Sequence, residues 1–241
     1  MECVCHFSTR VSKRRNNLRK RFLSFAQDYL QEAVGLLVLF DLDETLLDSL
    51  EAWLQAYLKV PETAGLPEEE IITSFFVRSE AAFERNGITD LNAFYSTLFN
   101  ALKEGGRVKV MENAEETVAQ LKKEGHKLGV VTSRNKSVAR LHCPQSLLDK
   151  LDVFVDRDDA RPKPAPDGIL KAYELAGVAA SQAVFVGDHS HDLQCAKAAG
   201  VPFFFFRHAD DKFQKHLKLD AAVSFSDFRE LPGLVQRPQG R

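Results

Sequence analysis

The sequence predicts an α/β protein, in which a doubly wound parallel sheet carries a small inserted helical unit. The first observation behind this prediction is that short apolar runs alternate along the chain with stretches of helical periodicity. The second is that these runs are continuously apolar, as in sheets whose two faces are both covered by helices. The third is that one long interval, residues 48–108, contains only helical patterns. Repeated strand–helix units are typical of doubly wound sheets.

Six apolar runs are the predicted strands. They are Leu36–Phe40, Lys127–Thr132, Leu151–Val155, Ala183–Val186, Pro202–Phe206 and Ala221–Phe225. Helices with readable ends lie between them, because proline suits a first helical turn and glycine suits the position after the last residue. These helices are Ala114–Glu124, Pro166–Ala176 and Asp192–Ala199, followed by Gly125, Gly177 and Gly200.

The interval after the first strand is predicted to be helical, since structureless loops of that length are uncommon in compact domains. Ser49 suits the start of a helix that runs to Lys59, Pro67 opens a second one, and Thr89 or Asp90 caps a third. An apolar stripe of the second helix is expected to be buried. It consists of Ile71, Ile72, Phe75, Phe76 and Phe83. The predicted organisation is a basic tail at 1–24, a Rossmann-like core at 25–47 and 109–241, and a helical cap at 48–108.

Composition excludes several classes of protein. The chain has 241 residues, of which 44% are hydrophobic and 27% charged, as in ordinary globular domains. A net charge of −2 argues against a general nucleic-acid binder, which usually has a basic domain. The longest apolar stretch, residues 33–40, is far shorter than the about 20 residues that a membrane helix needs. We therefore expect neither nucleic acid nor membrane as a partner.

The cysteines and the N-terminal tail bear on location. Four cysteines do not form the pattern of a secreted disulfide framework, so a reducing compartment, the cytoplasm, is predicted. Residues 1–24 contain seven Lys or Arg and a single acidic residue. A solvated tail is the simplest interpretation. A transit peptide for a mitochondrion or plastid, or a contact with an anionic membrane or nucleic acid, would also fit this pattern.

Polar side chains follow four of the predicted strands, at the edge where open α/β sheets bind their ligands. They are Asp41 and Asp43 after the first run, Thr132 at the end of the second run with Ser133 after it, Lys163 in a proline-braced loop after the third, and Asp188 with Asp192 after the fourth. Asp41 and Asp43 are two residues apart, so in an extended segment both would point the same way. Converging carboxylates need a cation between them, and hard oxygen ligands suit Mg²⁺.

These groups suit phosphoryl transfer, in which catalysis consists mainly of positioning and charge stabilisation. Mg²⁺, Lys163 and the Thr132 hydroxyl would provide the positive charge and hydrogen-bond donors that the transition state needs. Asp41 is predicted to attack phosphorus and form an aspartyl-phosphate, and Asp43 to act as the general acid and base.

Four motifs resemble those of the haloacid dehalogenase-like hydrolase superfamily, in that family's order. They are DLDETLLDS at 41–49, VTS at 131–133, KPAPD at 163–167, and VGD at 186–188 followed by Asp192. The resemblance covers residues 35–232 and is greatest to the subgroup with a helical cap after the first motif, which includes phosphoglycolate phosphatases. It implies a Mg²⁺-dependent phosphatase acting on a small phosphomonoester, of the phosphoglycolate, sugar phosphate or nucleotide class, through an aspartyl-phosphate.

The resemblance also implies a role for each matching residue. Asp41 matches the nucleophile and Asp43 the acid/base, while Thr132, Ser133 and Lys163 match the groups that hold the phosphoryl oxygens. The metal-binding set implied in this way is Asp41, Asp43, Asp188 and Asp192.

Several residues fall outside this pattern or beside it. Glu44 stands where the subgroup usually has glycine, so it is expected to narrow access or alter substrate preference. The cap also looks short for the subgroup. Arg134, just after the second motif, is a further candidate for substrate contact. Trp53 and Phe203–Phe206 are predicted to be core, and His189 and His191 to be exposed loop residues.

Two other functions fit parts of the pattern. A phosphosugar mutase has the same four motifs but returns the phosphoryl group to the sugar, and residues of the cap would decide between the two. A phospho-acceptor signalling module also places an aspartate, a hydroxyl, a lysine and an acid pair around Mg²⁺. In such a module the acid pair precedes the phosphorylated aspartate and no cap is inserted. The expected partner is a small phosphorylated metabolite, with monomer and homodimer equally compatible.

Overall fold

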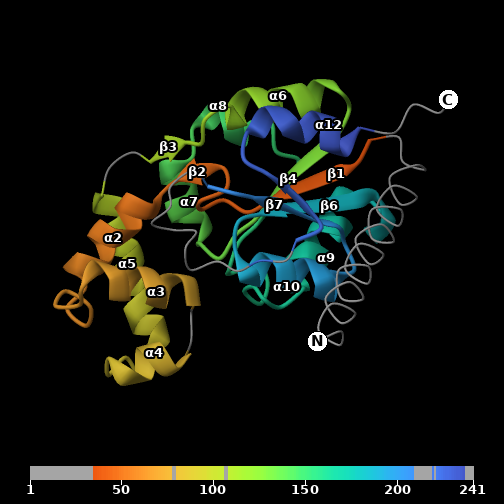
Figure 1. Ribbon diagram of the computed structural model, residues 1–241. Coiled ribbons are helices and arrows are strands. Elements are labelled where there is room, and N and C mark those ends of the chain that lie inside the picture. The colour runs from red at the N-terminus through yellow and green to blue at the C-terminus, as the bar shows by residue number, and fades with distance from the viewer. Residues whose placement is uncertain (1–34, 78–79, 106–107, 209–218, 220, 237–241) are drawn as a thin grey trace, which may run out of the picture.

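The computed structural model describes residues 35–77, 80–105, 108–208, 219 and 221–236. A parallel sheet with the strand order β5–β4–β1–β6–β7–β8 forms its centre (Figure 1). Its strands are β1 (Leu37–Phe40), β4 (Lys127–Val131), β5 (Val153–Val155), β6 (Ala183–Gly187), β7 (Phe203–Phe206) and β8 (Val223–Phe225). All six predicted runs are therefore strands of one sheet, and the predicted α/β fold is confirmed. The basic tail at 1–24 lies outside the described residues.

Helices cover both faces of this sheet (Figure 1). On one face lie α6 (Ala114–Lys123), α8 (Gln145–Leu148) and α12 (Leu231–Val235), and on the other lie α9 (Asp167–Ala176) and α10 (Ser190–Ala199). Successive side chains of a strand point to opposite faces. Val38 and Phe40 accordingly join the apolar cluster under α6, whereas Leu37 and Leu39 join the cluster under α9. Burial on both sides explains why the strands are continuously apolar.

The helix ends agree closely with the predicted ones. Gly177 and Gly200 have the left-handed conformation, with φ of 63° and 73°, that glycine adopts most readily after a last helical turn. Helix α10 begins two residues before the predicted start, at Ser190. The cause is a capping box, in which the Asp192 carboxylate accepts a hydrogen bond from the His189 N–H at 3.0 Å.

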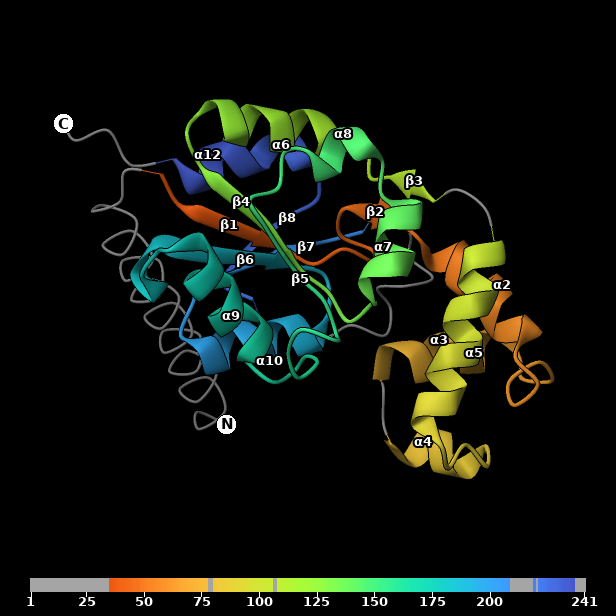
Figure 2. The same ribbon diagram turned by 180° about the vertical axis from the view of Figure 1, so that it is seen from behind.

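Four helices stand to one side of the sheet (Figure 2). They are α2 (Leu50–Lys59), α3 (Glu68–Val77), α4 (Glu80–Arg85) and α5 (Leu91–Glu104). They share a hydrophobic cluster that is separate from the two clusters of the sheet and contains Trp53, Tyr57, Phe94 and Leu98. Of the predicted stripe, Ile71, Ile72 and Phe83 are buried in it, while Phe75 and Phe76 belong to a stretch whose side chains are not described.

The chain enters and leaves these helices through a short antiparallel ribbon. β2 (Leu47–Asp48) pairs with β3 (Lys109–Val110), so that Asp48 lies opposite Lys109. Two-residue strands are too short to give a periodic pattern, and the sequence did not predict them. Helix α7 (Lys136–His142), which follows β4 and contacts α5, was not predicted either. None of the described helices is long and apolar enough to cross a membrane.

Candidate active site

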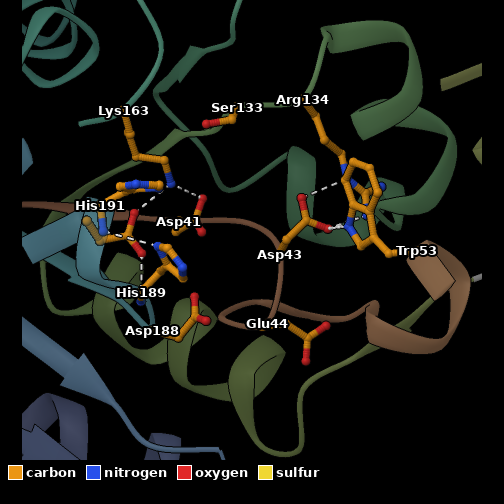
Figure 3. A pocket seen from close by; sticks show the side chains of 11 residues that line it. Asp41, Asp43, Glu44, Trp53, Ser133, Arg134, Lys163, Asp188, His189 and His191 are labelled. Atoms are coloured by element: carbon orange, nitrogen blue, oxygen red, sulfur yellow. Dashed lines mark hydrogen bonds and ion pairs between the residues drawn. The ribbon is translucent and has the colours of Figure 1, made fainter. Parts of the chain in front are cut away.

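A pocket lies at the carboxyl ends of β1, β4 and β6, next to helix α2 (Figure 3). All the predicted site residues line it except Thr132. Its lining consists of Asp41, Asp43, Glu44, Trp53, Ser133, Arg134, Lys163, Asp188, His189, His191 and Asp192. Thr132 is buried, and its hydroxyl oxygen accepts a hydrogen bond from the backbone N–H of Arg134 at 3.1 Å.

Lys163 bridges two carboxylates on one side of the pocket. Its Nζ lies 2.5 Å from Oδ1 of Asp41 and 2.6 Å from Oδ1 of Asp192. All three side chains are at most 10% exposed. Burial alone would lower the pKa of Lys163, but the carboxylates of Asp192 and Asp41 outweigh it and raise that pKa above its usual value. The lysine is therefore held in its charged form between the two acids.

Asp41, Asp188 and Asp192 form a buried group whose ligand oxygens lie within 4.8 Å of one another. Burial and the neighbouring acids raise the pKa of Asp41 to about 7, although Lys163 counteracts them. The same two causes raise the pKa of Asp188 well above its usual value. The Thr45 hydroxyl donates to Asp188 at 2.9 Å and orients it. Asp43, the fourth residue of the predicted metal set, is not part of this group.

Gly187 makes room for the third member of that group. A Cβ at this position would lie 2.7 Å from the carboxylate of Asp192, which is closer than real Cβ contacts come. Asp192 uses one oxygen to cap helix α10 and the other to accept from Lys163. The end of β6 therefore needs glycine so that a helix-capping acid can also lie against the lysine.

Asp43 lies on the other side of the pocket, where Arg134 and Trp53 hold it (Figure 3). Arg134 Nε donates to Oδ2 of Asp43 at 2.8 Å, and its Nη2 contacts Oδ1. The Trp53 indole N–H donates to the same Oδ1 at 2.7 Å, and the Ser49 hydroxyl at 2.6 Å. Burial would raise the pKa of Asp43, but Arg134 and these donors outweigh it and hold that pKa below its usual value.

The expectation that Asp41 and Asp43 point the same way is corrected by this geometry. Both line the same pocket, but the Asp41 carboxylate faces Lys163 and the Asp43 carboxylate faces Arg134 and Trp53 (Figure 3). The expectation assumed an extended segment. The chain instead bends at Leu42 and turns at Glu44, whose φ is 55°.

Glu44 occupies the turn after Asp43 and is almost completely buried. Its Oε1 accepts hydrogen bonds from the backbone N–H and the hydroxyl of Ser49, at 2.7 and 3.0 Å, just before helix α2 begins. Its Oε2 faces Nε2 of His208 at 3.6 Å. Burial raises the pKa of Glu44 to about 8. This residue forms part of the pocket wall and ties the first motif to the start of α2.

Sequence reasoning missed part of this lining. Trp53 was predicted to be core and is indeed buried with Tyr57 and Phe94, but its edge also reaches the pocket. His189 and His191 were expected to be exposed, yet they are half-buried and line the pocket as well. Their position just after Asp188 was the available signal, because the end of a central strand places its successors at the ligand-binding edge.

A parallel sheet with an acidic pocket and a buried lysine at its strand ends is typical of α/β proteins that bind a ligand at the carboxyl edge of the sheet. A family model described as haloacid dehalogenase-like hydrolase matches residues 38–206, well over half of the chain. The protein therefore belongs to the haloacid dehalogenase-like hydrolase family. The resemblance inferred from the four motifs is confirmed, and the protein is a hydrolase.

Relatives and solved structures agree with this assignment. Pyrophosphatase PpaX of Bacillus cereus is 32% identical over 172 residues, which are 68% of this chain and 79% of that protein. A haloacid dehalogenase superfamily hydrolase of subfamily IA from Geobacter sulfurreducens is 28% identical, with a TM-score of 0.59 over 83% of this chain and all of that one. A candidate phosphoglycolate phosphatase from Lactobacillus plantarum, 23% identical, shares the fold with a TM-score of 0.70 over 84% of this chain and all of its own.

Proposed function

We propose that this protein hydrolyses a small phosphomonoester, of the phosphoglycolate, sugar phosphate or nucleotide class, and that residues 48–108 form a cap over its catalytic core. The observation that carries this proposal is the buried contact of Lys163 with Asp41 and Asp192, beside Asp188, at the ends of β1 and β6. A charged lysine next to a nucleophilic carboxylate is suited to binding a phosphoryl dianion.

Mg²⁺ is the proposed cofactor, and the residues present fit it. Asp41, Asp188 and Asp192 provide three carboxylates against the single positive charge of Lys163, so two negative charges remain to be balanced in a buried place. Their oxygens are the hard ligands that Mg²⁺ prefers, and burial together with the neighbouring carboxylates raises the pKa values of Asp41 and Asp188. When bound, the ion would neutralise charge on the phosphoryl oxygens.

The proposed reaction has two steps, with Asp41 as the nucleophile. An oxygen of Asp41 bonds to phosphorus while the bond to the leaving oxygen breaks. Asp43, which takes up a proton once it has left Arg134, gives that proton to the leaving oxygen. In the second step Asp43 takes a proton from water, whose oxygen bonds to phosphorus. The Asp41–phosphorus bond then breaks and inorganic phosphate leaves.

The remaining groups are proposed to hold the phosphoryl oxygens. Lys163 supplies positive charge, while Ser133 and the Thr132 hydroxyl supply hydrogen-bond donors. Thr132 accepts from the Arg134 N–H, which leaves its own proton free to be donated. A cap on this site would exclude water from the reacting groups and select substrates by size.

The name of one relative suggests a second candidate reaction. Because PpaX of Bacillus cereus is named a pyrophosphatase, hydrolysis of a phosphoanhydride is a second candidate reaction for the same residues.

The proposed location is a reducing compartment such as the cytoplasm. Cys143 and Cys195 are both buried free thiols, which supports this location.

The experiment is release of p-nitrophenol from p-nitrophenyl phosphate, measured with Mg²⁺ and with EDTA. We expect turnover by the wild type with Mg²⁺ only, and none by Asp41→Asn. Asp48→Asn is the matched control, because Asp48 is an exposed carboxylate of the same motif that does not line the pocket. Equal turnover in Asp41→Asn and Asp48→Asn would contradict the proposal. Conversion of one sugar phosphate isomer into another without phosphate release would favour the mutase instead.

A further inference from the structure

Arg134 is a second buried cation of the pocket, and the proposed reaction does not use it. It follows β4, and its side chain has no exposed surface. In the described part of the chain, the carboxylate that pairs with it is Asp43. A buried charge that loses its partner is strongly destabilising, because neither water nor an opposite charge then stabilises it.

Asp43 cannot remain on Arg134 and also serve the proposed reaction. Figure 3 shows the Asp43 carboxylate turned towards Arg134 and Trp53, away from the side where Lys163 contacts Asp41. To give a proton to an oxygen leaving a phosphoryl group at Asp41, Asp43 has to turn away from Arg134. That movement is unfavourable unless another anion takes its place on the guanidinium.

We propose that Arg134 is a second anion-binding group of this pocket, which Asp43 occupies in the absence of substrate and which a second anionic group of the substrate takes over. The exchange keeps Arg134 paired and frees Asp43 to face the leaving oxygen. The inference rests on the proposed function and narrows its substrate class. The preferred substrates carry a carboxylate or a second phosphate close to the reacting phosphoryl group.

The chemistry of the guanidinium supports this exchange. Arg134 holds Asp43 through two of its nitrogens, Nε and Nη2, and such a fork binds carboxylates and phosphates in the same bidentate way. A substrate anion of either kind is therefore able to replace the Asp43 carboxylate without a change in the arginine.

Arg134 also has supports that do not depend on Asp43. Its guanidinium carbon lies 5.0 Å from the ring centre of Trp53, and Nη1 lies 2.6 Å from Nδ1 of His142. Nη1 can only donate, so Nδ1 of His142 accepts and Nε2 donates to the Leu102 carbonyl at 3.1 Å. Burial and Arg134 lower the pKa of His142, in keeping with this neutral ring. The guanidinium is thus fixed in position by α2 and α7 before any ligand arrives.

The first test uses two substrates that differ only in the second anion. In 2-phosphoglycolate a carboxylate replaces the hydroxymethyl group of 2-hydroxyethyl phosphate. We expect wild-type kcat/KM to be higher for 2-phosphoglycolate by about tenfold or more, the size of effect that a hydrogen-bonded charged group gives. In Arg134→Met the ratio falls towards one, and Arg134→Lys lies between. Pyrophosphate tests a phosphate as the second anion, and its turnover should fall with that of 2-phosphoglycolate.

Arg157→Met is the matched control. Arg157 also stacks on aromatic rings of α5, 4.6 Å from the ring centre of Tyr95 and 5.2 Å from that of Phe99, but it does not line the pocket. We expect this variant to retain the wild-type ratio. A ratio is unaffected by a loss of folded protein, so partial unfolding of Arg134→Met does not imitate the effect. A wild-type ratio near one, or an unchanged ratio in Arg134→Met, would overturn the inference.

The second test measures binding without turnover. Trp53 is the single tryptophan of the chain, and its indole N–H donates to Asp43, so its fluorescence reports on this contact. In Asp41→Asn we expect a saturable change of emission with 2-phosphoglycolate, and a smaller one with saturating 2-hydroxyethyl phosphate. If this difference is seen but no phosphate ester is hydrolysed by the wild type, the anion site stands and the proposed function fails. If the wild type hydrolyses both esters and the two emission changes are equal, the proposed function stands and the anion site fails.

Discussion

The two sides of the pocket each hold a buried cation against aspartates, but their charge balance differs. Around Lys163 there are three carboxylates, Asp41, Asp188 and Asp192, for one positive charge. Among the residues that the structure describes, the carboxylate paired with Arg134 is that of Asp43, so that this pair is neutral. Burial, together with the neighbouring acids, raises the pKa of Asp41, whereas Arg134 outweighs burial and lowers that of Asp43. Before any ligand binds, the lysine side has more negative than positive charge, whereas the charges of the arginine side balance.

This difference indicates what each side has to do. The lysine side gains stability when a divalent cation arrives, which is what a metal-dependent site requires. The arginine side must exchange one anion for another before Asp43 can act. A site of this kind would discriminate between substrates by charge as well as by size, since a substrate with a single anionic group has nothing to replace Asp43 on Arg134.

The largest effect is expected from removing Lys163, the cation of the side that has an excess of carboxylates. Lys163→Met leaves Asp41 and Asp192 buried without their positive partner. We expect turnover to fall by about a thousandfold or more and the free energy of unfolding to fall by about 3–5 kcal/mol at neutral pH. Phosphatase assays and urea denaturation measure the two losses. Lys171→Met, a half-exposed lysine on α9, is the control and should change both quantities little.

The balanced side is tested by a double-mutant cycle on Arg134 and Asp43. Arg134→Met and Asp43→Asn alone each leave one buried partner without its opposite charge, whereas the double variant removes both charges. We expect a coupling free energy of unfolding of about 1.5–3 kcal/mol, as for hydrogen bonds between charged groups. Strictly additive losses would mean that the pair contributes nothing, and the proposed exchange would lose its basis.

The effect of pH on stability follows from the raised pKa of Asp41. Between its ordinary value of 3.8 and about 7, the unfolded chain has lost this proton while the folded protein keeps it. Asp41 therefore makes the metal-free protein less stable as pH rises from about 4 to about 7, and adds no further change above that range. Melting temperatures of the wild type and Asp41→Asn in EDTA measure its contribution. With Mg²⁺ the difference in melting temperature between the two proteins should shrink. A difference that Mg²⁺ leaves unchanged would contradict metal binding at Asp41.

The smallest effect is expected at Gly187, which leaves room for the carboxylate of Asp192. Gly187→Ala places a Cβ against the carboxylate of Asp192, which is fixed by its contacts with Lys163 and the start of α10. We expect a loss of about 1–3 kcal/mol in the free energy of unfolding, together with weaker Mg²⁺ binding. Gly65→Ala, where a Cβ would meet nothing within 4 Å, is the control and should be nearly neutral. Equal stability of the two variants would show that Asp192 has room to move.

The sequence predicted those parts of the molecule that depend on local patterns. Continuous apolar runs located the six strands, and the polar residues that follow them located Asp41, Lys163 and Asp188 at one edge, because parallel strands bring their carboxyl ends together. The pairing of Arg134 with Asp43 could not be predicted in this way. It depends on a bend at Leu42 and on the hydrogen bond from the Trp53 indole to Asp43. It also depends on His142, which lies in a helix that was not predicted.

The aspartyl-phosphate on Asp41 is tested most directly by trapping the covalent intermediate. Wild-type protein is mixed with Mg²⁺ and a phosphomonoester that it turns over, quenched in acid within the first turnovers, digested and sequenced by mass spectrometry. The mechanism predicts one phosphoryl group on Asp41, absent from Asp41→Asn and from a sample prepared in EDTA. Rapid turnover with no labelled peptide, or with the phosphoryl group on Asp43 or another residue, would contradict it.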